Sequence, residues 1–424
     1  MAKVSDRVVR LAVFTLLIIG LITFFSSSSP SAPSGTYTKP SSSSGSSSKD
    51  KAADFISKGD SVKASGSDSD SSNSLFSSFS SSSKSTDKLP FDVPDYIDPN
   101  YARENATFIS LARNEDLWEL VPAIRSVEDR FNSKYKYDWV FLNEEPFSVE
   151  FKTVMTSLVS GEAKFGLIPK EHWSFPDWID TDKAAQTRED MKNIIYGSSI
   201  SYRHMCRFES GFFFHHELMQ NYKYYWRVEP STKLYCDVNF DVFKFMRENN
   251  KDYGFTISIH EFEATIKTLW SETKKFVAAN PQYVAEDNFM NFISDNNGET
   301  YNLCHFWTNF EVANMDFWRG EAYQAYFQHL EKAGGFFYER WGDAPVHSIA
   351  ASLFLPQDRI HFFEEIGYFH GPYHHCPIND EIRNKNKCMC KPGDDFTWQD
   401  YSCTRKYYDV KGLAKPLGWE KHTG

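Results

Sequence analysis

Residues 107–142 read TFISLARNEDLWELVPAIRSVEDRFNSKYKYDWVFL, and this stretch decides the fold class. The run 107–112 is apolar and has the length of a buried strand. Apolar residues then recur at steps of three and four from Leu117 to Phe131, which indicates one face of a helix. A second strand is predicted over 137–142. A strand, a helix and a strand this close together predict a right-handed crossover between two parallel strands, and therefore an α/β fold.

The turn after the first strand is polar. Asn114 is expected to be the N-cap of the helix, with Glu115 and Asp116 in its first turn. Neither Gly-x-Gly-x-x-Gly nor Gly-Lys-Ser/Thr follows the strand, which excludes a dinucleotide fingerprint and a P-loop there. The phosphates of a nucleotide bound to this fold would therefore need another counter-charge.

The first 90 of the 424 residues differ from the rest in composition. Basic residues precede the charge-free apolar run 11–25, which predicts a signal-anchor transmembrane helix with a cytosolic tail, residues 1–10. A cleaved signal peptide is the alternative, because the run is short for a membrane span. Residues 26–90 contain 28 serines and predict a disordered stem. Both interpretations send residues 91–424, the expected single folded domain, to the secretory lumen.

Two further features fit an oxidising compartment. Asn105 begins an N-glycosylation sequon, Asn-Ala-Thr. The seven cysteines are expected to form disulfides and to leave at least one thiol free. A zinc site is the alternative for the C-terminal group, although Cys-x-Cys is poor zinc spacing. That site would draw on His374, His375, Cys376, Cys388, Cys390 and Cys403.

Candidate metal ligands follow from a predicted strand at 224–228. The strand ends at Glu229-Pro230, and ligands of open α/β sheets gather at the carboxyl ends of strands. A divalent cation that bridges a diphosphate needs only one or two protein oxygens. The alternative for Glu229 is an acid in a simple turn. His370 is a lone histidine in the segment 367–370, and ordinary packing is the expected role of such a residue. The net charge of −11 argues against nucleic acid as a partner.

Two other carboxylates stand out. Glu311 follows an aromatic stretch, and a carboxylate beside a glycosidic carbon can act as a nucleophile or stabilise an oxocarbenium-like transition state. A salt bridge or a helix-start acid is the alternative. Asp343 precedes a predicted helix, 345–353, and is expected to be its N-cap. A further helix is predicted over 317–332.

Five long blocks resemble the fungal α-1,2-mannosyltransferases of glycosyltransferase family 15. The similarity runs from about Asp92 to Tyr408, and the tail, anchor and stem match the type II layout of Golgi glycosyltransferases. The blocks are residues 164–176, 201–214, 224–230, 301–311 and 334–351.

The resemblance implies a GT-A fold with one mixed central sheet, GDP-mannose as donor, Mn²⁺ as cofactor and retention of the anomeric configuration. The acceptor would be a mannose hydroxyl of an O-linked or N-linked glycan in the Golgi lumen. The resemblance is also compatible with complexes between this protein and other mannosyltransferases. A mannose-binding lectin, an inactive complex partner and a retaining glycosidase are the alternatives. By position, the family assigns Glu229 and His370 to the metal, Glu311 to the nucleophile, Tyr202 to the active site, Arg113 to the nucleotide, and Arg227 and Asp343 to sugar or phosphate.

Overall fold

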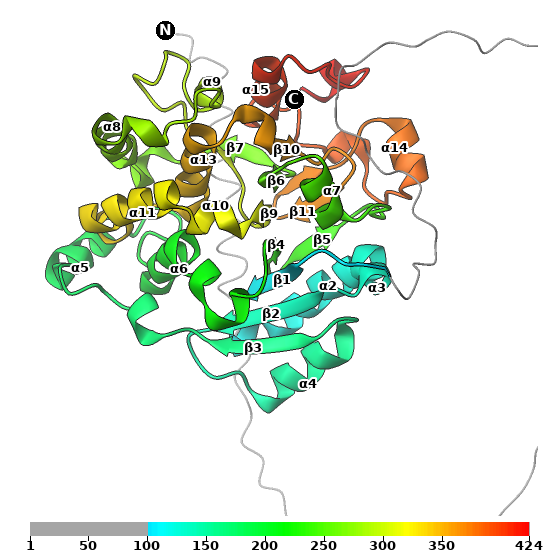
Figure 1. Ribbon diagram of the computed structural model, residues 1–424, viewed down its shortest axis with the longest axis horizontal. Coiled ribbons are helices and arrows are strands. Elements are labelled where there is room, and N and C mark those ends of the chain that lie inside the picture. Colours follow the sequence, from blue (N-terminus) through cyan, green and yellow to red (C-terminus); the bar gives the residue numbers. More distant parts are fainter. Residues whose placement is uncertain (1–100, 424) are drawn as a thin grey trace, which may run out of the picture. The chain divides into compact units, whose positions relative to one another are not determined.

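The computed structural model describes residues 101–423 (Figure 1). The expected tail, anchor and stem lie outside these residues, as do the first ten residues of the expected domain. Among the described residues, no helix combines the length and the apolar character needed to cross a membrane.

The centre of the fold is a seven-stranded mixed sheet in the order β10-β6-β9-β4-β1-β2-β3. Only β9 runs antiparallel to its neighbours β4 and β6, and the other pairs are parallel. The predicted α/β class with a mixed sheet is therefore confirmed. The strands are β1 (Ala106–Leu111), β2 (Asp138–Asn143), β3 (Ala163–Leu167), β4 (Tyr224–Val228), β6 (Tyr253–Phe255), β9 (Phe310–Asn314) and β10 (Ile360–Phe362).

The predicted crossover unit is present between β1 and β2. Its helix α2 (Leu117–Val127) buries Leu117, Leu120, Ala123, Ile124 and Val127, continues through a π-helical turn at 128–132, and ends with α3 (Ser133–Tyr135). The predicted cap is wrong, because Asn114 lies inside a 3-10 turn, where its side chain accepts a hydrogen bond from the Ser148 backbone and donates to the Pro146 carbonyl. The residue thus joins this turn to the start of α4 (Val149–Leu158).

Helices cover both faces of the sheet and make two separate cores. Side chains alternate along β1, so Phe108 belongs to the core that contains α2, α4 and α7, whereas Ile109 belongs to the core that contains α6, α11 and α13. The first layer contains α2, α4 (Val149–Leu158) and α7 (Val242–Glu248); the second contains α6 (Ile200–Gly211), α8 (Leu269–Ala279), α11 (Glu321–Ala333) and α13 (Asp343–Phe354). The shorter helices are α5 (Thr181–Asp190), α9 (Met290–Ile293), α10 (Met315–Arg319), α12 (Gly335–Tyr338), α14 (Asp380–Lys385) and α15 (Thr404–Lys411).

Two predicted helices differ in their bounds. The one expected over 317–332 is divided at Gly320 into α10 and α11, because the Gly320 backbone is extended. The one expected over 345–353 begins two residues earlier, as α13.

Two small antiparallel sheets flank the main one. The first has the order β12-β11-β5, and the second pairs β7 with β8. Their strands are β5 (Thr232–Leu234), β7 (Ser258–His260), β8 (Cys304–Phe306), β11 (Tyr368–His370) and β12 (Tyr373–His375).

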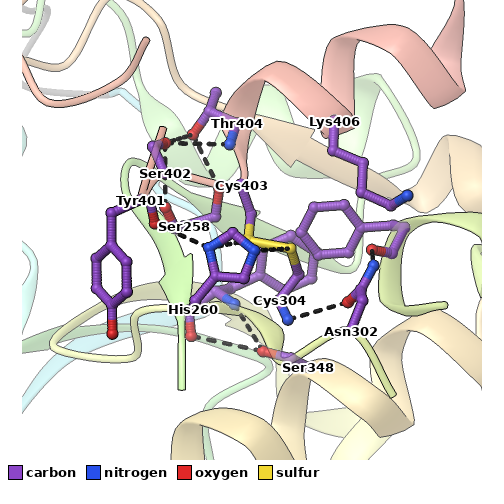
Figure 2. The surroundings of a disulfide bond; sticks show 12 residues. Ser258, His260, Asn302, Cys304, Ser348, Tyr401, Ser402, Cys403, Thr404 and Lys406 are labelled. Atoms are coloured by element: carbon purple, nitrogen blue, oxygen red, sulfur yellow. Dashed lines mark hydrogen bonds between the residues drawn. A yellow bond between two sulfur atoms is a disulfide. The ribbon is translucent and has the colours of Figure 1, made fainter. Parts of the chain in front are cut away.

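Three disulfides join residues in or next to these small sheets to residues 388–403. They pair Cys236 with Cys388, Cys304 with Cys403, and Cys376 with Cys390, and Cys206 is left as a buried free thiol. The expected disulfides are confirmed. The zinc alternative is wrong, because all four of its cysteines are in disulfides. Figure 2 shows the Cys304–Cys403 bond beside the imidazole of His260, which lies 3.6 Å from each sulfur.

Candidate functional site

The candidate site lies at the carboxyl end of β4. Glu229 follows this strand, and the chain turns at once into β5, which pairs with β11 so that Thr232 lies opposite His370. This pairing brings the imidazole Nε2 of His370 to 4.0 Å from the Glu229 carboxylate. Both side chains are about one quarter exposed, at 27% and 26%, so a ligand can reach them. The two residues predicted as metal ligands are thus brought together.

The chemistry of this pair fits a divalent cation. Burial, only partly opposed by the Glu229 carboxylate, lowers the pKa of His370, so the imidazole is neutral and its nitrogen can act as a ligand. The buried Nδ1 of His370 has no hydrogen-bond partner among the described residues. One imidazole nitrogen and one carboxylate oxygen suit Mn²⁺. Two protein ligands fall short of a closed structural site, which leaves coordination positions for phosphate oxygens and water.

Arg227 connects the metal pair to other carboxylates. Its buried guanidinium donates to Glu229 and to Asp343, the latter at 2.6 Å, and lies 3.6 Å from Glu209. Burial alone would lower the pKa of Arg227, but Glu209, Glu229 and Asp343 outweigh it and raise the pKa well above its usual value. Arg227 therefore stays charged and holds Glu229 in place. Its role toward sugar or phosphate stays a prediction.

Asp343 is not a helix cap, so that prediction is wrong. Gly342 occupies the N-cap position, and Asp343 is the first residue of α13. Its carboxylate accepts hydrogen bonds from Arg227 and, at 2.7 Å, from the Thr308 hydroxyl. Burial would raise the pKa of Asp343, but Arg227 and His347 outweigh it and lower the pKa. The residue is an ionised acceptor inside the site, and its role toward a sugar stays a prediction.

Glu311 lies in β9, opposite Arg227 in the neighbouring strand β4. The carboxylate is fully buried and accepts hydrogen bonds from the Tyr225 hydroxyl, from the Tyr253 hydroxyl at 2.8 Å, and from His347 Nδ1, which lies 3.0 Å away. The helix-start alternative is wrong because Glu311 lies in a strand, whereas the salt-bridge alternative is met by His347 when its imidazole is protonated. Its role as nucleophile stays a prediction.

Tyr202 lies in the first turn of α6. Its ring stacks on that of Tyr196, with centroids 4.5 Å apart, and the Arg340 guanidinium lies 5.1 Å from its centroid. One turn along α6, the buried thiol of Cys206 contacts both the Tyr202 side chain and the Asp343 backbone. Tyr202 is thus connected to the carboxylate group around Arg227.

The remaining predicted residues lie at opposite edges of the sheet. Arg113 follows β1, which runs parallel to β4, so it lies at the same edge as Glu229. Its guanidinium is half-exposed and pairs with Glu115 and Asp116. Asn105 precedes β1 at the other edge and is exposed, as a glycosylation site must be.

Comparison with known proteins decides the family. Residues 63–412 match the family model described as glycolipid 2-alpha-mannosyltransferase. The chain belongs to glycosyltransferase family 15. This family-15 glycosyltransferase is 63% identical over 319 residues to glycolipid 2-alpha-mannosyltransferase 2 of Candida albicans, a match that covers 75% of this chain and 69% of the relative. It is 61% identical over 335 residues to the alpha-1,2 mannosyltransferase KTR1 of Saccharomyces cerevisiae, a match that covers 78% and 84% of the two chains.

A solved structure agrees with the family. The crystal structure of core-mannan synthase A (CmsA/Ktr4) from Aspergillus fumigatus, in its Mn/GDP form, superposes on this family-15 chain with a TM-score of 0.69. The two sequences are 42% identical, and the superposition covers 75% of this chain and 88% of the other. The fold is therefore an α/β glycosyltransferase fold. Its mixed sheet contains Glu311, and Glu229 directly follows one of its strands.

Several residues of this family-15 site were missed in the sequence. Glu209 resembles a surface acid in a helix, and its only signal is a position seven residues after Tyr202, on the same helix face. Nothing in the residues around His347 and Tyr253 distinguishes these two from packing residues. Tyr196 lies in a turn between helices, where an aromatic residue gives no periodic signal.

Proposed function

We propose that this protein is a Mn²⁺-dependent, retaining α-1,2-mannosyltransferase that moves mannose from GDP-mannose to a mannose hydroxyl of an O-linked or N-linked glycan. The observation that carries the proposal is the pairing of Glu229 with His370 at the carboxyl edge of the sheet, in a chain of family 15. The Mn/GDP form of core-mannan synthase A supports the donor and the metal. The mixed sheet supports a GT-A arrangement.

The residues have distinct tasks in this proposal. Glu229 and His370 hold the cation, which neutralises charge on the leaving diphosphate when it is bound. Arg227 fixes the orientation of Glu229 through their ion pair. Asp343, kept ionised by Arg227, can accept hydrogen bonds from sugar hydroxyls. Arg113, at the same edge, can contact the nucleotide.

Retention can follow two routes. One uses two inversions through a mannosyl-Glu311 intermediate; the other is a front-face reaction in which the departing phosphate guides the acceptor hydroxyl. Three hydrogen-bond donors surround the Glu311 carboxylate, and no part of it is exposed. Hydrogen bonds to the charged form lower the nucleophilicity of a carboxylate, which favours the second route, with Glu311 as a source of negative charge.

We further propose a type II protein of the Golgi membrane with a lumenal catalytic domain at residues 91–424. The apolar run 11–25 and the three disulfides support this placement, because disulfides persist in oxidising compartments.

The test is an assay of the purified full chain with GDP-mannose, Mn²⁺ and methyl α-mannoside, with the product linkage assigned by NMR. We expect an α-1,2-linked disaccharide that is lost when EDTA is added. No product with Mn²⁺, or equal product with EDTA, would contradict the proposal. A lectin would bind mannose without consuming GDP-mannose, so the same assay separates the two.

A further inference from the structure

Tyr196 is an exposed aromatic residue directly beside the site. It lies in the turn between α5 and α6, and its side chain is 56% exposed although its ring stacks on Tyr202 at an angle of 11°. Ile195 and Ile200 in the same segment are also exposed. Exposed apolar groups that adjoin one another mark binding surfaces more often than isolated ones do.

The turn that presents Tyr196 is held by hydrogen bonds from a buried side chain. The backbone of Tyr196 has a left-handed conformation, φ 56°, which is unfavourable for a bulky residue and persists only where the surroundings enforce it. The buried Arg203 enforces it by donating to the carbonyl oxygens of Gly197 at 2.8 Å and of Ser199 at 3.0 Å. A residue held in this way loses little conformational entropy when a ligand binds.

Helix α6 links the surroundings of the metal pair to Tyr196. Tyr202, Cys206 and Glu209 share one face of this helix, at spacings of four and seven residues. Glu209 contacts Arg227, which holds the metal ligand Glu229, whereas Tyr202 contacts Tyr196 at the surface. Seven helical residues span about 10 Å. Tyr202, and with it the exposed ring of Tyr196, therefore lies about two helical turns from the residue that contacts Arg227.

From this geometry we propose that Tyr196 is a sugar-binding residue for the acceptor and contacts the mannose next to the one that receives the transferred sugar. The inference rests on the proposed function and names the acceptor class as oligosaccharides of two or more mannoses. The apolar face of a mannopyranose packs on the exposed part of the Tyr196 ring, so the ring and not the hydroxyl supplies the contact. The partly buried Tyr202 supports the ring from its other side.

The test compares two acceptors, methyl α-mannoside and α-1,2-mannobiose, with the full chain and four variants. Tyr196→Ala removes the ring. Tyr196→Asn also removes it, with a residue that tolerates the left-handed backbone. Tyr196→Phe keeps the ring. Trp118→Ala is the matched control, because Trp118 is 65% exposed but belongs to α2, on the opposite face of the sheet.

We expect the ratio of kcat/KM for mannobiose to kcat/KM for methyl α-mannoside to fall about tenfold in Tyr196→Ala and Tyr196→Asn, which corresponds to about 1.4 kcal/mol of binding. The ratio should be kept in Tyr196→Phe and in Trp118→Ala. Equal losses with both acceptors, or a changed KM for GDP-mannose alone, would overturn the inference, because Tyr196 would then only support Tyr202 or bind the donor. If the wild-type chain transfers mannose to neither acceptor, the proposed function itself fails.

Discussion

Arg227 donates a 2.6 Å hydrogen bond to Asp343, and both side chains are buried. Replacement of Arg227 by alanine would remove the ion-pair partner of the buried carboxylates of Asp343 and Glu209. Removal of one partner of a buried ion pair lowers the free energy of unfolding by about 3–5 kcal/mol. We therefore expect the free energy of unfolding of Arg227→Ala to fall by that amount in urea titrations. The exposed pair of Arg125 and Asp129 offers the control, since Arg125→Ala should cost less than about 1 kcal/mol. Similar losses in both variants would show that the buried charges rearrange freely.

Removal of either proposed metal ligand should abolish catalysis and leave the fold intact. Glu229 and His370 are partly exposed, so Glu229→Gln and His370→Ala should unfold at nearly the wild-type urea concentration. Loss of an outer-shell partner already weakens metal binding about 10–100-fold, and loss of a ligand should weaken it at least as much. Titration with Mn²⁺ followed by electron paramagnetic resonance measures this affinity directly. Unchanged affinity in both variants would place the metal elsewhere.

The substitution Glu311→Gln separates the two routes to retention. If Glu311 only stabilises charge, kcat should fall on the order of 10²–10³-fold, as for other electrostatic groups, with an unchanged KM for GDP-mannose. Mass spectrometry of the quenched wild-type enzyme should then show no mannosyl adduct. A trapped adduct on Glu311 would restore the double-displacement route.

Glu209 should make stability depend on pH in a defined direction. Burial raises the pKa of Glu209 from 4.5 to about 7, with Arg227 opposing. The folded state therefore binds this proton more tightly than the unfolded state does, so the free energy of unfolding should fall as the pH rises from about 4.5 to about 7. The contribution is at most about 3.5 kcal/mol, because the pKa shift spans about 2.5 pH units and each unit corresponds to about 1.4 kcal/mol.

The measurement is urea unfolding of wild type and Glu209→Gln at pH 4.5 and pH 7.5. Other titrating groups are common to both proteins, so the difference between them isolates Glu209. Wild type should lose stability relative to the variant as the pH rises. Parallel curves would mean that Glu209 titrates alike in the folded and unfolded chains.

The disulfides should contribute unequally to stability. The Cys236–Cys388 bond closes a loop with a sequence separation of 152, and Cys376–Cys390 one of only 14. Loop-closure entropy predicts about 3 kcal/mol for the short loop and about 5 kcal/mol for the long one. Chemical denaturation of the two paired alanine variants should therefore show the larger loss when Cys236 and Cys388 are replaced. The reverse order would show that residual structure in the unfolded chain dominates.

The local pattern of apolar residues predicted much of this fold. The remaining features depend on contacts between residues that are remote in the sequence. The unit at 107–142 was predictable because its apolar periodicity and its burial agree. Asp343 was mistaken for a cap because a first-turn acid and an N-cap acid look alike in sequence, whereas the partner that distinguishes them, Arg227, is remote in the chain. Glu229 was a candidate because it follows a predicted strand, whereas His370 could be singled out only by resemblance to the family. Their proximity depends on the pairing of β5 with β11, which no local pattern encodes.

That pairing also sets the order in which the protein matures. His370 reaches Glu229 only when β11 adds to β5, and β5 precedes most of the second helical layer in the chain. A ribosome-bound chain that has not yet supplied β11 therefore has half of its proposed metal-binding pair. On the proposed assignment, metal binding is thus acquired near the end of synthesis, after the sheet and most of its helices have been made.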